Sequence, residues 1–254
     1  MKQWALILGA SSGIGAACAK KLAESGINIY GIYLRKPQSV ISELESYIKS
    51  QNVDVHFHKM NAMNEDKRAE AINHLKTLGT VKCFIHSIAF GTLKPMLSND
   101  NESTLDSKNI DMTISVMGSS LVYWSQALHQ SNLLKKGSQI FSMTSSGGRK
   151  QWKSYGAVSM AKAALESASR QLAIELAPEG IAVNAIQAGV TDTPALRKIP
   201  GHEDMVKYAS THNPSGRLTK PEDIADYITL LSHASNSWLT GNVIRVDGGE
   251  DIIG

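Results

Sequence analysis

Short apolar segments of strand length alternate along the chain with longer amphipathic segments. The apolar segments predict strands at Trp4–Leu8, Ile27–Tyr33, Val53–His58, Cys83–Ile88, Gln139–Thr144, Ala182–Gln187 and Val243–Val246. The amphipathic segments predict helices at Ile14–Ser25, Ser39–Lys49, Glu65–Leu78, Leu105–Leu133, Tyr155–Ala177 and Pro221–Ser232. Strands that alternate with helices form βαβ units. The pattern therefore predicts an α/β fold: a doubly wound, Rossmann-type, parallel seven-stranded sheet with helices on both faces.

The end of the chain contains one marked helix start and one long stretch without a clear element. Thr219 is expected to cap the last helix, with the side chain of Glu222 reaching back to it. Residues 191–217 (Thr191–Arg217) show no helix or strand pattern, and a connection this long in a compact domain is usually functional. No linker-like stretch divides the sequence, so residues 1–254 are expected to form a single domain.

Composition and charge exclude several classes of protein. Hydrophobic residues make up 42% of the 254 residues, which suffices for a core without a disulfide or metal staple. The net charge is +3 with no run of Lys or Arg, so no nucleic-acid partner is expected. The apolar run before Gly9 is too short for a signal peptide or a membrane span. Together with the unpaired Cys18 and Cys83, this predicts a cytoplasmic protein without a membrane partner.

The histidines predict no metal site. None of them has the spacing of metal ligands. His86 lies in a predicted strand and is interpreted as structural, whereas His58, His202 and His212 are interpreted as surface residues.

A glycine-rich loop follows the first predicted strand. It reads Gly9-Ala10-Ser11-Ser12-Gly13-Ile14-Gly15 and opens directly into the first helix. Glycines allow the tight turn and the close approach of a pyrophosphate, which the N–H groups of the helix N-terminus can bind. The strand–loop–helix context predicts a dinucleotide-binding site, with a structural turn as the weaker alternative.

The spacing of these glycines resembles that of the short-chain dehydrogenase/reductase family. Asn184 and Gly189–Thr193 follow the sixth strand as they do in that family, and Gly241–Gly249 is similar to its last strand and turn. The resemblance runs over nearly the whole chain and implies a nicotinamide-dependent oxidoreductase. Residues 191–217 would then cover the substrate.

The residues after the second strand predict the cofactor. NAD-binding proteins place an acid there, but this strand ends in Arg35 and Lys36, which suit the 2′-phosphate of NADPH. NADPH is therefore expected, with NADH as the weaker alternative. The resemblance implies that Asn61 lines the adenine pocket. It also implies that the cofactor contacts Ser87, Ile88, Ala89, Lys162, Ala188, Gly189, Val190, Thr191 and Thr193.

The spacing of two catalytic candidates indicates a branch of this family. Carbonyl reducers carry Tyr-x-x-x-Lys, but here Tyr155 is followed by Ser159 and the lysine comes at Lys162. Seven residues span nearly two helical turns, so Tyr155 and Lys162 can share one face. This spacing resembles the enoyl-acyl carrier protein reductases, as do segments 86–90 and 184–189. Positions 192–217 are similar to the NADPH-dependent FabL-type class.

The resemblance implies a role for each candidate. Tyr155 would hydrogen-bond the thioester oxygen, on which charge develops when hydride adds to the β-carbon of an enoyl thioester. Lys162 would hold the nicotinamide ribose. Ser145 stands where many enoyl reductases carry a second tyrosine, and it is a third catalytic candidate or a loop cap. The relay asparagine of carbonyl reducers is missing, because Val116-Met117-Gly118-Ser119 occupies that stretch.

These observations predict an NADPH-dependent enoyl-acyl carrier protein reductase of fatty acid synthesis. Its substrate would be an enoyl thioester on acyl carrier protein. The family resemblance also implies a homotetramer formed partly through the fourth and fifth helices. One alternative is a short-chain carbonyl or 3-oxoacyl-acyl carrier protein reductase, which Ser145 favours and Ser159 disfavours. Another is a nucleotide-binding protein without catalysis, which Tyr155 and Lys162 disfavour.

Overall fold

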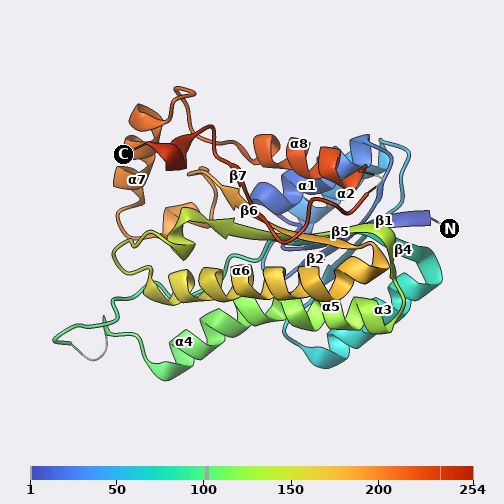
Figure 1. Ribbon diagram of the computed structural model, residues 1–254, viewed down its shortest axis with the longest axis horizontal. Coiled ribbons are helices and arrows are strands. Elements are labelled where there is room, and N and C mark those ends of the chain that lie inside the picture. The colour runs from blue at the N-terminus through green and yellow to red at the C-terminus, as the bar shows by residue number, and fades with distance from the viewer. Residues whose placement is uncertain (1, 101–102, 235, 254) are drawn as a thin grey trace.

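The protein is built around one parallel seven-stranded sheet. The computed structural model describes residues 2–100, 103–234 and 236–253. The strands are β1 (Lys2–Leu8), β2 (Asn28–Tyr33), β3 (Val55–Lys59), β4 (Gly79–His86), β5 (Leu134–Ser145), β6 (Ala182–Ala188) and β7 (Val243–Val246). They are ordered β3-β2-β1-β4-β5-β6-β7, which confirms the predicted Rossmann-type fold (Figure 1). β4 and β5 begin earlier than predicted, because their first residues mix polar positions into the apolar pattern.

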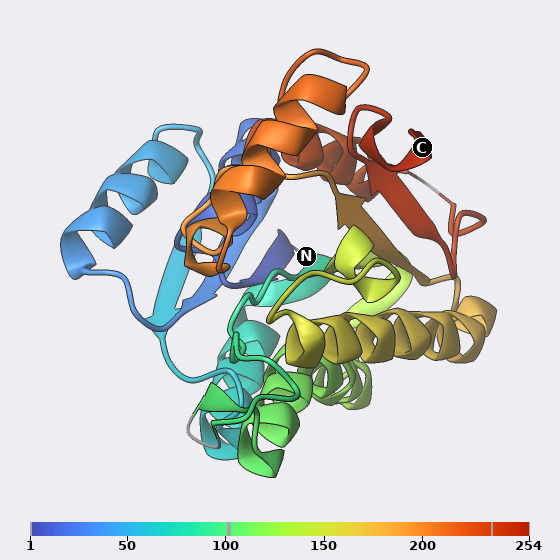
Figure 2. The ribbon, with the colours of Figure 1, turned by 90° about the vertical axis from the view of Figure 1, so that its left-hand side faces the viewer.

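Helices cover both faces of the sheet, as predicted. They are α1 (Gly13–Glu24), α2 (Gln38–Lys49), α3 (Glu65–Leu78), α4 (Ser107–Ile114), α5 (Ser120–Gln130), α6 (Gly156–Leu176), α7 (His202–His212) and α8 (Pro221–Ser232). In Figure 1, α1, α2 and α8 lie on one side of the sheet and α3, α4, α5 and α6 on the other. In the turned view of Figure 2 the connections at one end of the strands face the viewer.

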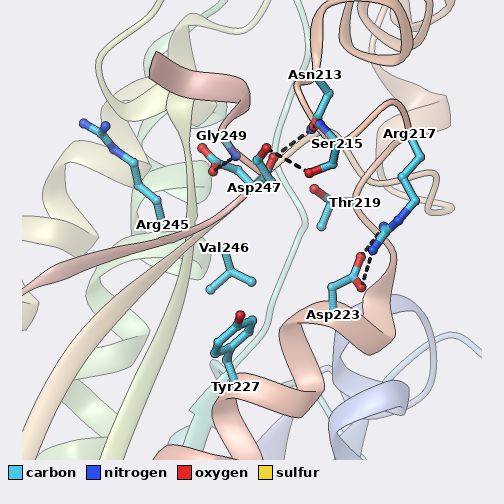
Figure 3. A pocket seen from close by; sticks show the side chains of 11 residues that line it. Asn213, Ser215, Arg217, Thr219, Asp223, Tyr227, Arg245, Val246, Asp247 and Gly249 are labelled. Carbon is cyan, nitrogen blue, oxygen red and sulfur yellow. Dashed lines mark hydrogen bonds and ion pairs between the residues drawn. The ribbon is translucent and has the colours of Figure 1, made fainter. Parts of the chain in front are cut away.

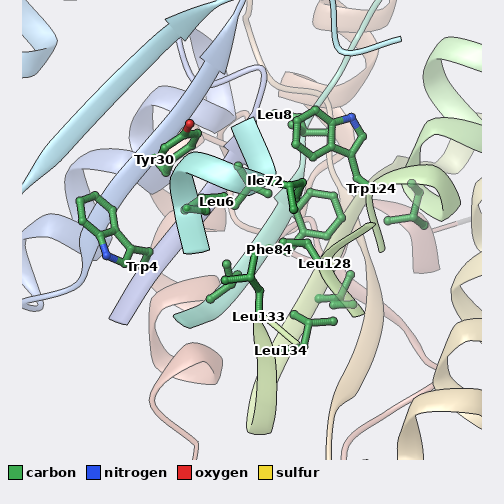
Figure 4. Packing of buried hydrophobic residues seen from close by; sticks show 14 of the residues in the cluster. Trp4, Leu6, Leu8, Tyr30, Ile72, Phe84, Trp124, Leu128, Leu133 and Leu134 are labelled. Carbon is green, nitrogen blue, oxygen red and sulfur yellow. The ribbon is translucent and has the colours of Figure 1, made fainter. Parts of the chain in front are cut away.

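Each face of the sheet carries its own buried apolar cluster. Trp4, Leu6 and Leu8 of β1 pack with Phe84 and Trp124 against α3, α5 and α6 (Figure 4). The intervening residues of β1 point to the opposite face, where they pack beneath α1 and α8. This alternation follows from the period of two along a strand, and it fixes the register of the central strand.

The strand order positions the functional residues. The chain runs from β1 outward to β3, then crosses back to β4 and continues to β7. Loops leaving the carboxyl ends of β1 and β4 therefore diverge, and ligands of doubly wound folds bind at such a divergence.

The predicted helix Leu105–Leu133 is interrupted. A π-helical turn at Ser115–Ser119 separates α4 from α5. A Cβ on Gly118 would lie 3.1 Å from the Ala161 carbonyl oxygen, so this glycine permits α6 to pack closely on the turn. The hydrophobic period alone does not reveal such an insertion, and π-helical turns often mark functional sites.

The prediction that residues 191–217 lack an element of their own is wrong. The segment contains a 3-10 turn at Leu196–Lys198 and the helix α7. Gly201, with φ of 75°, precedes α7, and acidic residues occupy its first turn. Ala209 is buried, but most of α7 is exposed, so its apolar stripe is short and escaped notice in the sequence.

The predicted cap of the last helix is displaced by one residue. Lys220 is the N-cap of α8, and its N–H donates to Asp223 at 2.8 Å in place of the expected Thr219–Glu222 box. Thr219 is buried instead and forms a β-bridge with Thr191. The threonine is therefore used to hold the long connection against the sheet.

Candidate active site

The loop between β1 and α1 leaves no room for side chains at its glycines. A Cβ on Gly9 would lie 2.3 Å from the Ser87 carbonyl oxygen, and one on Gly15 would lie 2.2 Å from the Gly9 carbonyl oxygen. Gly9 and Gly13 also have φ of 83° and 54°, which favours glycine. The first turn of α1 contains no acidic residue, and Ser12 makes no side-chain cap. The backbone N–H groups in the first turn of α1 therefore have no acidic or capping side chain as a competitor for a bound anion. The loop fits a dinucleotide pyrophosphate.

The other predicted cofactor residues lie at the same edge of the sheet. Ser11 and Ile14 belong to the loop itself. Ser87, Ile88 and Ala89 directly follow β4, whereas Ala188, Gly189, Val190, Thr191 and Thr193 end or follow β6. A Cβ on Gly13 would lie 3.3 Å from Cγ2 of Thr193. The parallel sheet thus brings the segments after β1, β4 and β6 to one place.

The residues predicted to select the cofactor follow β2 and β3. The Arg35 guanidinium lies over the Phe90 ring, 3.9 Å from its centroid. Since β2 and β4 flank β1, this pair spans the carboxyl end of β1. Arg35 makes no ion pair with any described residue, and Lys36 beside it is half-buried. Asn61 is exposed and accepts the Met63 N–H at 3.0 Å, so its place in an adenine pocket stays a prediction.

Tyr155 and Ser145 lie side by side. Tyr155 immediately precedes α6, and Ser145 ends β5. A Cβ on Gly147 would lie 2.5 Å from the Tyr155 ring and 3.1 Å from Ser145 Oγ, so this glycine makes room for both. Burial raises the pKa of the Tyr155 phenol, and the adjacent Ser145 hydroxyl opposes the shift. Ser145 Oγ is buried and reaches no regular hydrogen-bond geometry with the described residues.

Lys162 is held at the end of β5. Its side chain is buried, and Nζ donates to the Met143 carbonyl oxygen at 2.6 Å. Burial lowers its pKa to about 8, while the negative charge of Glu166, one helical turn further on, opposes this shift. Glu166 in turn accepts the Thr144 hydroxyl at 2.6 Å. The sheet and α6 thus hold a lysine whose pKa lies close to neutral pH.

Ser159 occupies the place of the lysine of carbonyl reducers, and it has another partner. Its hydroxyl donates to the Gly147 carbonyl oxygen at 2.5 Å, and its N–H donates to the Tyr155 carbonyl at 2.8 Å. Ser159 therefore fixes the turn after β5 against the start of α6. Lys162 remains as the cation on this face of α6.

The segment after β6 is docked against the site. Trp152, in the connection before α6, donates through Nε1 to the Pro200 carbonyl oxygen at 3.2 Å. Arg197 forms a two-pronged ion pair with Asp192, with both distances 2.8 Å. The 3-10 turn and α7 thus lie next to the loop that precedes Tyr155. The predicted covering role of 191–217 stays a proposal.

Sequence reasoning missed residues that support the candidate site. Glu166 and Thr144 form the hydrogen bond that faces Lys162, and neither stood out in the sequence. An acid four residues after Lys162, on the face of a helix that packs on the sheet, is the signal that could have revealed Glu166. His86 is fully buried, which agrees with its interpretation as structural.

Two hollows lie outside the predicted site. One, of about 340 Å³, lies between β7 and the start of α8 (Figure 3). Its walls include Tyr227 and the Arg217–Asp223 ion pair, and it contains none of the predicted site residues. The other, of about 410 Å³, lies beside β3 and is lined in part by Tyr30, His58 and His74.

His58 was wrongly expected at the surface. It is half-buried and stacks on Tyr30, with ring centroids 4.6 Å apart. Burial lowers the pKa of both His56 and His58, and the nearby His74 adds to the effect. Among the residues that the structure describes, no cluster of acidic, histidine or cysteine side chains is arranged to hold a metal ion. In the same part of the chain, no helix combines the length and apolar character needed to cross a membrane.

The fold is that of a short-chain dehydrogenase/reductase. Residues 9–250 match the family described as enoyl-(acyl carrier protein) reductase, and the chain belongs to this family. It is therefore an oxidoreductase of the short-chain type, with NAD(P)H as the cofactor typical of that class.

Several curated proteins are similar over nearly their whole length. The chain is 31% identical to an uncharacterized oxidoreductase, YjdA, of Bacillus subtilis, covering 96% of this chain and 95% of that protein. It is 26% identical to the NADPH-dependent enoyl-acyl carrier protein reductase FabI of Staphylococcus aureus, with 93% and 91% covered. It is 25% identical to a diacetyl reductase of Staphylococcus epidermidis, with 98% of each chain covered.

The crystal structure of FabI from Candidatus Liberibacter asiaticus has the same fold. The TM-score is 0.87 at 24% identity, covering 99% of this chain and 96% of that one. At this level of identity the likeness concerns the fold alone.

Proposed function

We propose that the protein is an NADPH-dependent enoyl-acyl carrier protein reductase of the FabL type, which reduces the 2,3 double bond of enoyl thioesters in fatty acid synthesis. The observation that carries this proposal is the pair Tyr155 and Lys162 at one end of α6. Ser159, which lies between them in the sequence, is occupied by a hydrogen bond to the Gly147 carbonyl oxygen. The match to the enoyl reductase family supports it.

Each residue of the proposed site has a separate role in the reaction. A bound nicotinamide would supply the hydride that adds to the β-carbon of the enoyl thioester, and a proton from solvent would complete the reduction at C2. Negative charge then develops on the thioester oxygen, and the Tyr155 hydroxyl donates a hydrogen bond to it. The pKa of this phenol is raised by burial, so the hydroxyl stays protonated and able to donate at neutral pH. Lys162 would hold the nicotinamide ribose through its buried ammonium group.

NADPH is the proposed cofactor because of Arg35. Its guanidinium has no ion-pair partner among the described residues, and it lies at the carboxyl end of β1 above the Phe90 ring. A planar guanidinium can bind a 2′-phosphate with two parallel hydrogen bonds. Lys36 adds a second positive charge at the same place.

The proposal extends to the carrier protein and the assembly. The connection after β6 would close over the acyl chain, and its exposed Lys198 would attract an acidic carrier protein. Arg197 contributes less, because Asp192 already neutralises it. We further propose that the protein works in the cytoplasm as a homotetramer. Tyr123 of α5 and Ile174 of α6, which are 39% and 71% exposed, would then lie in the subunit contacts.

One observation favours a second candidate function. Ser145 lies beside Tyr155, and its buried Oγ makes no hydrogen bond of regular geometry with the described residues, so the hydroxyl is available to donate to a substrate carbonyl. A short-chain carbonyl or 3-oxoacyl-acyl carrier protein reductase is therefore the alternative.

A comparison of two substrates tests the proposal. Purified protein is mixed with NADPH and either crotonyl or acetoacetyl thioester, and NADPH consumption is followed. The proposal expects crotonyl thioester to be reduced with the higher kcat/KM and Ser145→Ala to retain most of that activity. Faster reduction of acetoacetyl thioester, lost in Ser145→Ala, would establish the alternative instead.

A further inference from the structure

His86, the last residue of β4, is fully buried, and the proposed chemistry does not use it. Its Nε2 lies 2.7 Å from Ser120 Oγ, and that hydroxyl donates to the Val116 carbonyl oxygen at 2.7 Å. A hydroxyl has one proton to donate. Since Ser120 gives its proton to Val116, it accepts from His86, and Nε2 carries the imidazole proton.

The other ring nitrogen is left as a bare acceptor. Nδ1 of His86 is buried and has no hydrogen-bond partner among the described residues. Burial and the charge of Lys162 lower the pKa of His86 to about 3, so the ring is neutral at any physiological pH. An acceptor buried without a partner is costly, and such groups in folded proteins usually have a functional partner or a bound water.

Lys162 is a donor that the sheet brings close to the end of β4, and its charge acts on His86. In the sheet His86 is paired with Ser142, and Lys162 donates to the carbonyl of the next residue, Met143. An ammonium group carries three protons, so Lys162 has two left after that bond. One suits the nicotinamide ribose and the other suits an acceptor inside the protein.

The same region lacks the side chain that carbonyl reducers use there. Val116, Met117, Gly118 and Ser119 occupy the place of their relay asparagine, and these residues form the π-helical turn. Val116 is also the acceptor at the end of the chain from His86 through Ser120. Through the Val116 carbonyl, the turn therefore sets the tautomer of a histidine on the neighbouring strand.

We propose that His86 is a positioning residue: its Nδ1 accepts a hydrogen bond that reaches it from the Lys162 ammonium through one buried water, and so keeps Lys162 charged and directed at the cofactor. The inference rests on the proposed place of Lys162 at the nicotinamide ribose. It holds whichever thioester is the substrate.

Among the described residues, Glu166 is the other ionisable group whose charge acts on Lys162, and Tyr155 lies at the start of α6. The pKa of Lys162 is about 8, so the loss of one acceptor changes its charge near neutral pH. A charged lysine binds the cofactor more tightly. Cofactor affinity should therefore fall as the pH rises through the pKa of Lys162.

Two matched variants separate this role from a structural one. The amide of His86→Asn reaches about as far as Nδ1, whereas the longer His86→Gln reaches about as far as Nε2 and keeps the bond to Ser120. The dissociation constant of NADPH is measured by fluorescence between pH 6.5 and 9, and the melting temperature of each variant is recorded. No substrate is needed, so failure of the enoyl reductase proposal leaves this test intact.

We expect the midpoint of the pH dependence to stay in place in His86→Asn. In His86→Gln it should move down by about one pH unit, which weakens NADPH binding about fivefold at pH 8. The melting temperature of His86→Gln should change little. A wild-type midpoint in His86→Gln, with loss of stability confined to His86→Asn, would show that His86 only holds Ser120.

A second measurement, on the unmodified His86 ring, tests the inference even if the His86 variants do not fold or the protein does not bind NADPH. Nitrogen-15 NMR of the wild-type histidines should show His86 protonated on Nε2 at pH 7. Its Nδ1 resonance should move in Lys162→Met. The opposite tautomer, or an Nδ1 resonance that Lys162→Met leaves unchanged, would overturn the inference.

Discussion

Arg35→Ala tests the structural basis of the proposed cofactor preference. Arg35 is exposed and stacks on Phe90, and it makes no ion pair with a described residue, so its removal disturbs no buried contact. The stacking itself is worth about 0.5–1 kcal/mol at an exposed site. A charge-assisted hydrogen bond to the 2′-phosphate is worth about 1.5–3 kcal/mol. Arg35→Ala should therefore raise the Kd of NADPH about 10- to 140-fold.

NADH is the internal control, because it lacks the 2′-phosphate. Its Kd should change less than about fivefold, which corresponds to the stacking alone. Phe90→Leu is the matched protein control, since it removes the stacking and keeps the guanidinium. Both Kd values are measured by titration of the fluorescence of the reduced cofactor. Equal affinity of the wild-type protein for NADH and NADPH, or equal losses of both in Arg35→Ala, would refute the reasoning.

Four further perturbations test other parts of the account. Tyr155→Phe should lower kcat for crotonyl thioester about 10²- to 10⁴-fold, with NADPH affinity retained; a small loss would remove the phenol from the mechanism. Gly15→Ala places a Cβ 2.2 Å from the Gly9 carbonyl oxygen, so NADPH titration should detect little binding, and normal affinity would contradict the tight loop. His56 and His58 have lowered pKa values, so the free energy of unfolding in urea should fall as the pH drops below about 6.5, less so in His58→Phe. Lys198→Glu should lower kcat/KM for the carrier-bound substrate and spare a small thioester, and equal losses would mean that Lys198 shapes the pocket.

The sign of the histidine effect follows from the direction of the shifts. Burial lowers the pKa of His58 in the folded state, so the unfolded chain binds more protons below its ordinary pKa of about 6.5. Stability is therefore complete above that pH and is lost as the pH falls toward the folded pKa. A free energy of unfolding that rises on acidification would contradict the described burial of these rings.

The fold followed from the sequence because period and composition agree along most of the chain. Trp4, Leu6 and Leu8 alternate with Ala5 and Ile7, and both sets are buried, so the central strand reads as an unbroken apolar run. The glycine loop was equally plain, since Gly9 and Gly15 occupy positions that admit no Cβ. Such positions require glycine, so they can be recognised from the sequence.

The parts that escaped depend on tertiary contacts. The π-helical turn at Ser115–Ser119 leaves the hydrophobic period nearly unchanged, and its cause is the contact of Gly118 with α6. Glu166 and Thr144 are ordinary polar residues until β5 and α6 pack together. The exposed α7 carries little apolar signal, and its place beside Trp152 follows from the docking of Pro200.

The central claim is that hydride passes from NADPH to the β-carbon of an enoyl thioester. The most direct test supplies NADPH carrying deuterium at the transferred position, together with crotonyl thioester, and locates the label in the product by NMR. The account predicts butyryl thioester with one deuterium at C3 and a solvent hydrogen at C2. Unchanged crotonyl thioester, together with acetoacetyl thioester converted to labelled 3-hydroxybutyryl thioester, would contradict it.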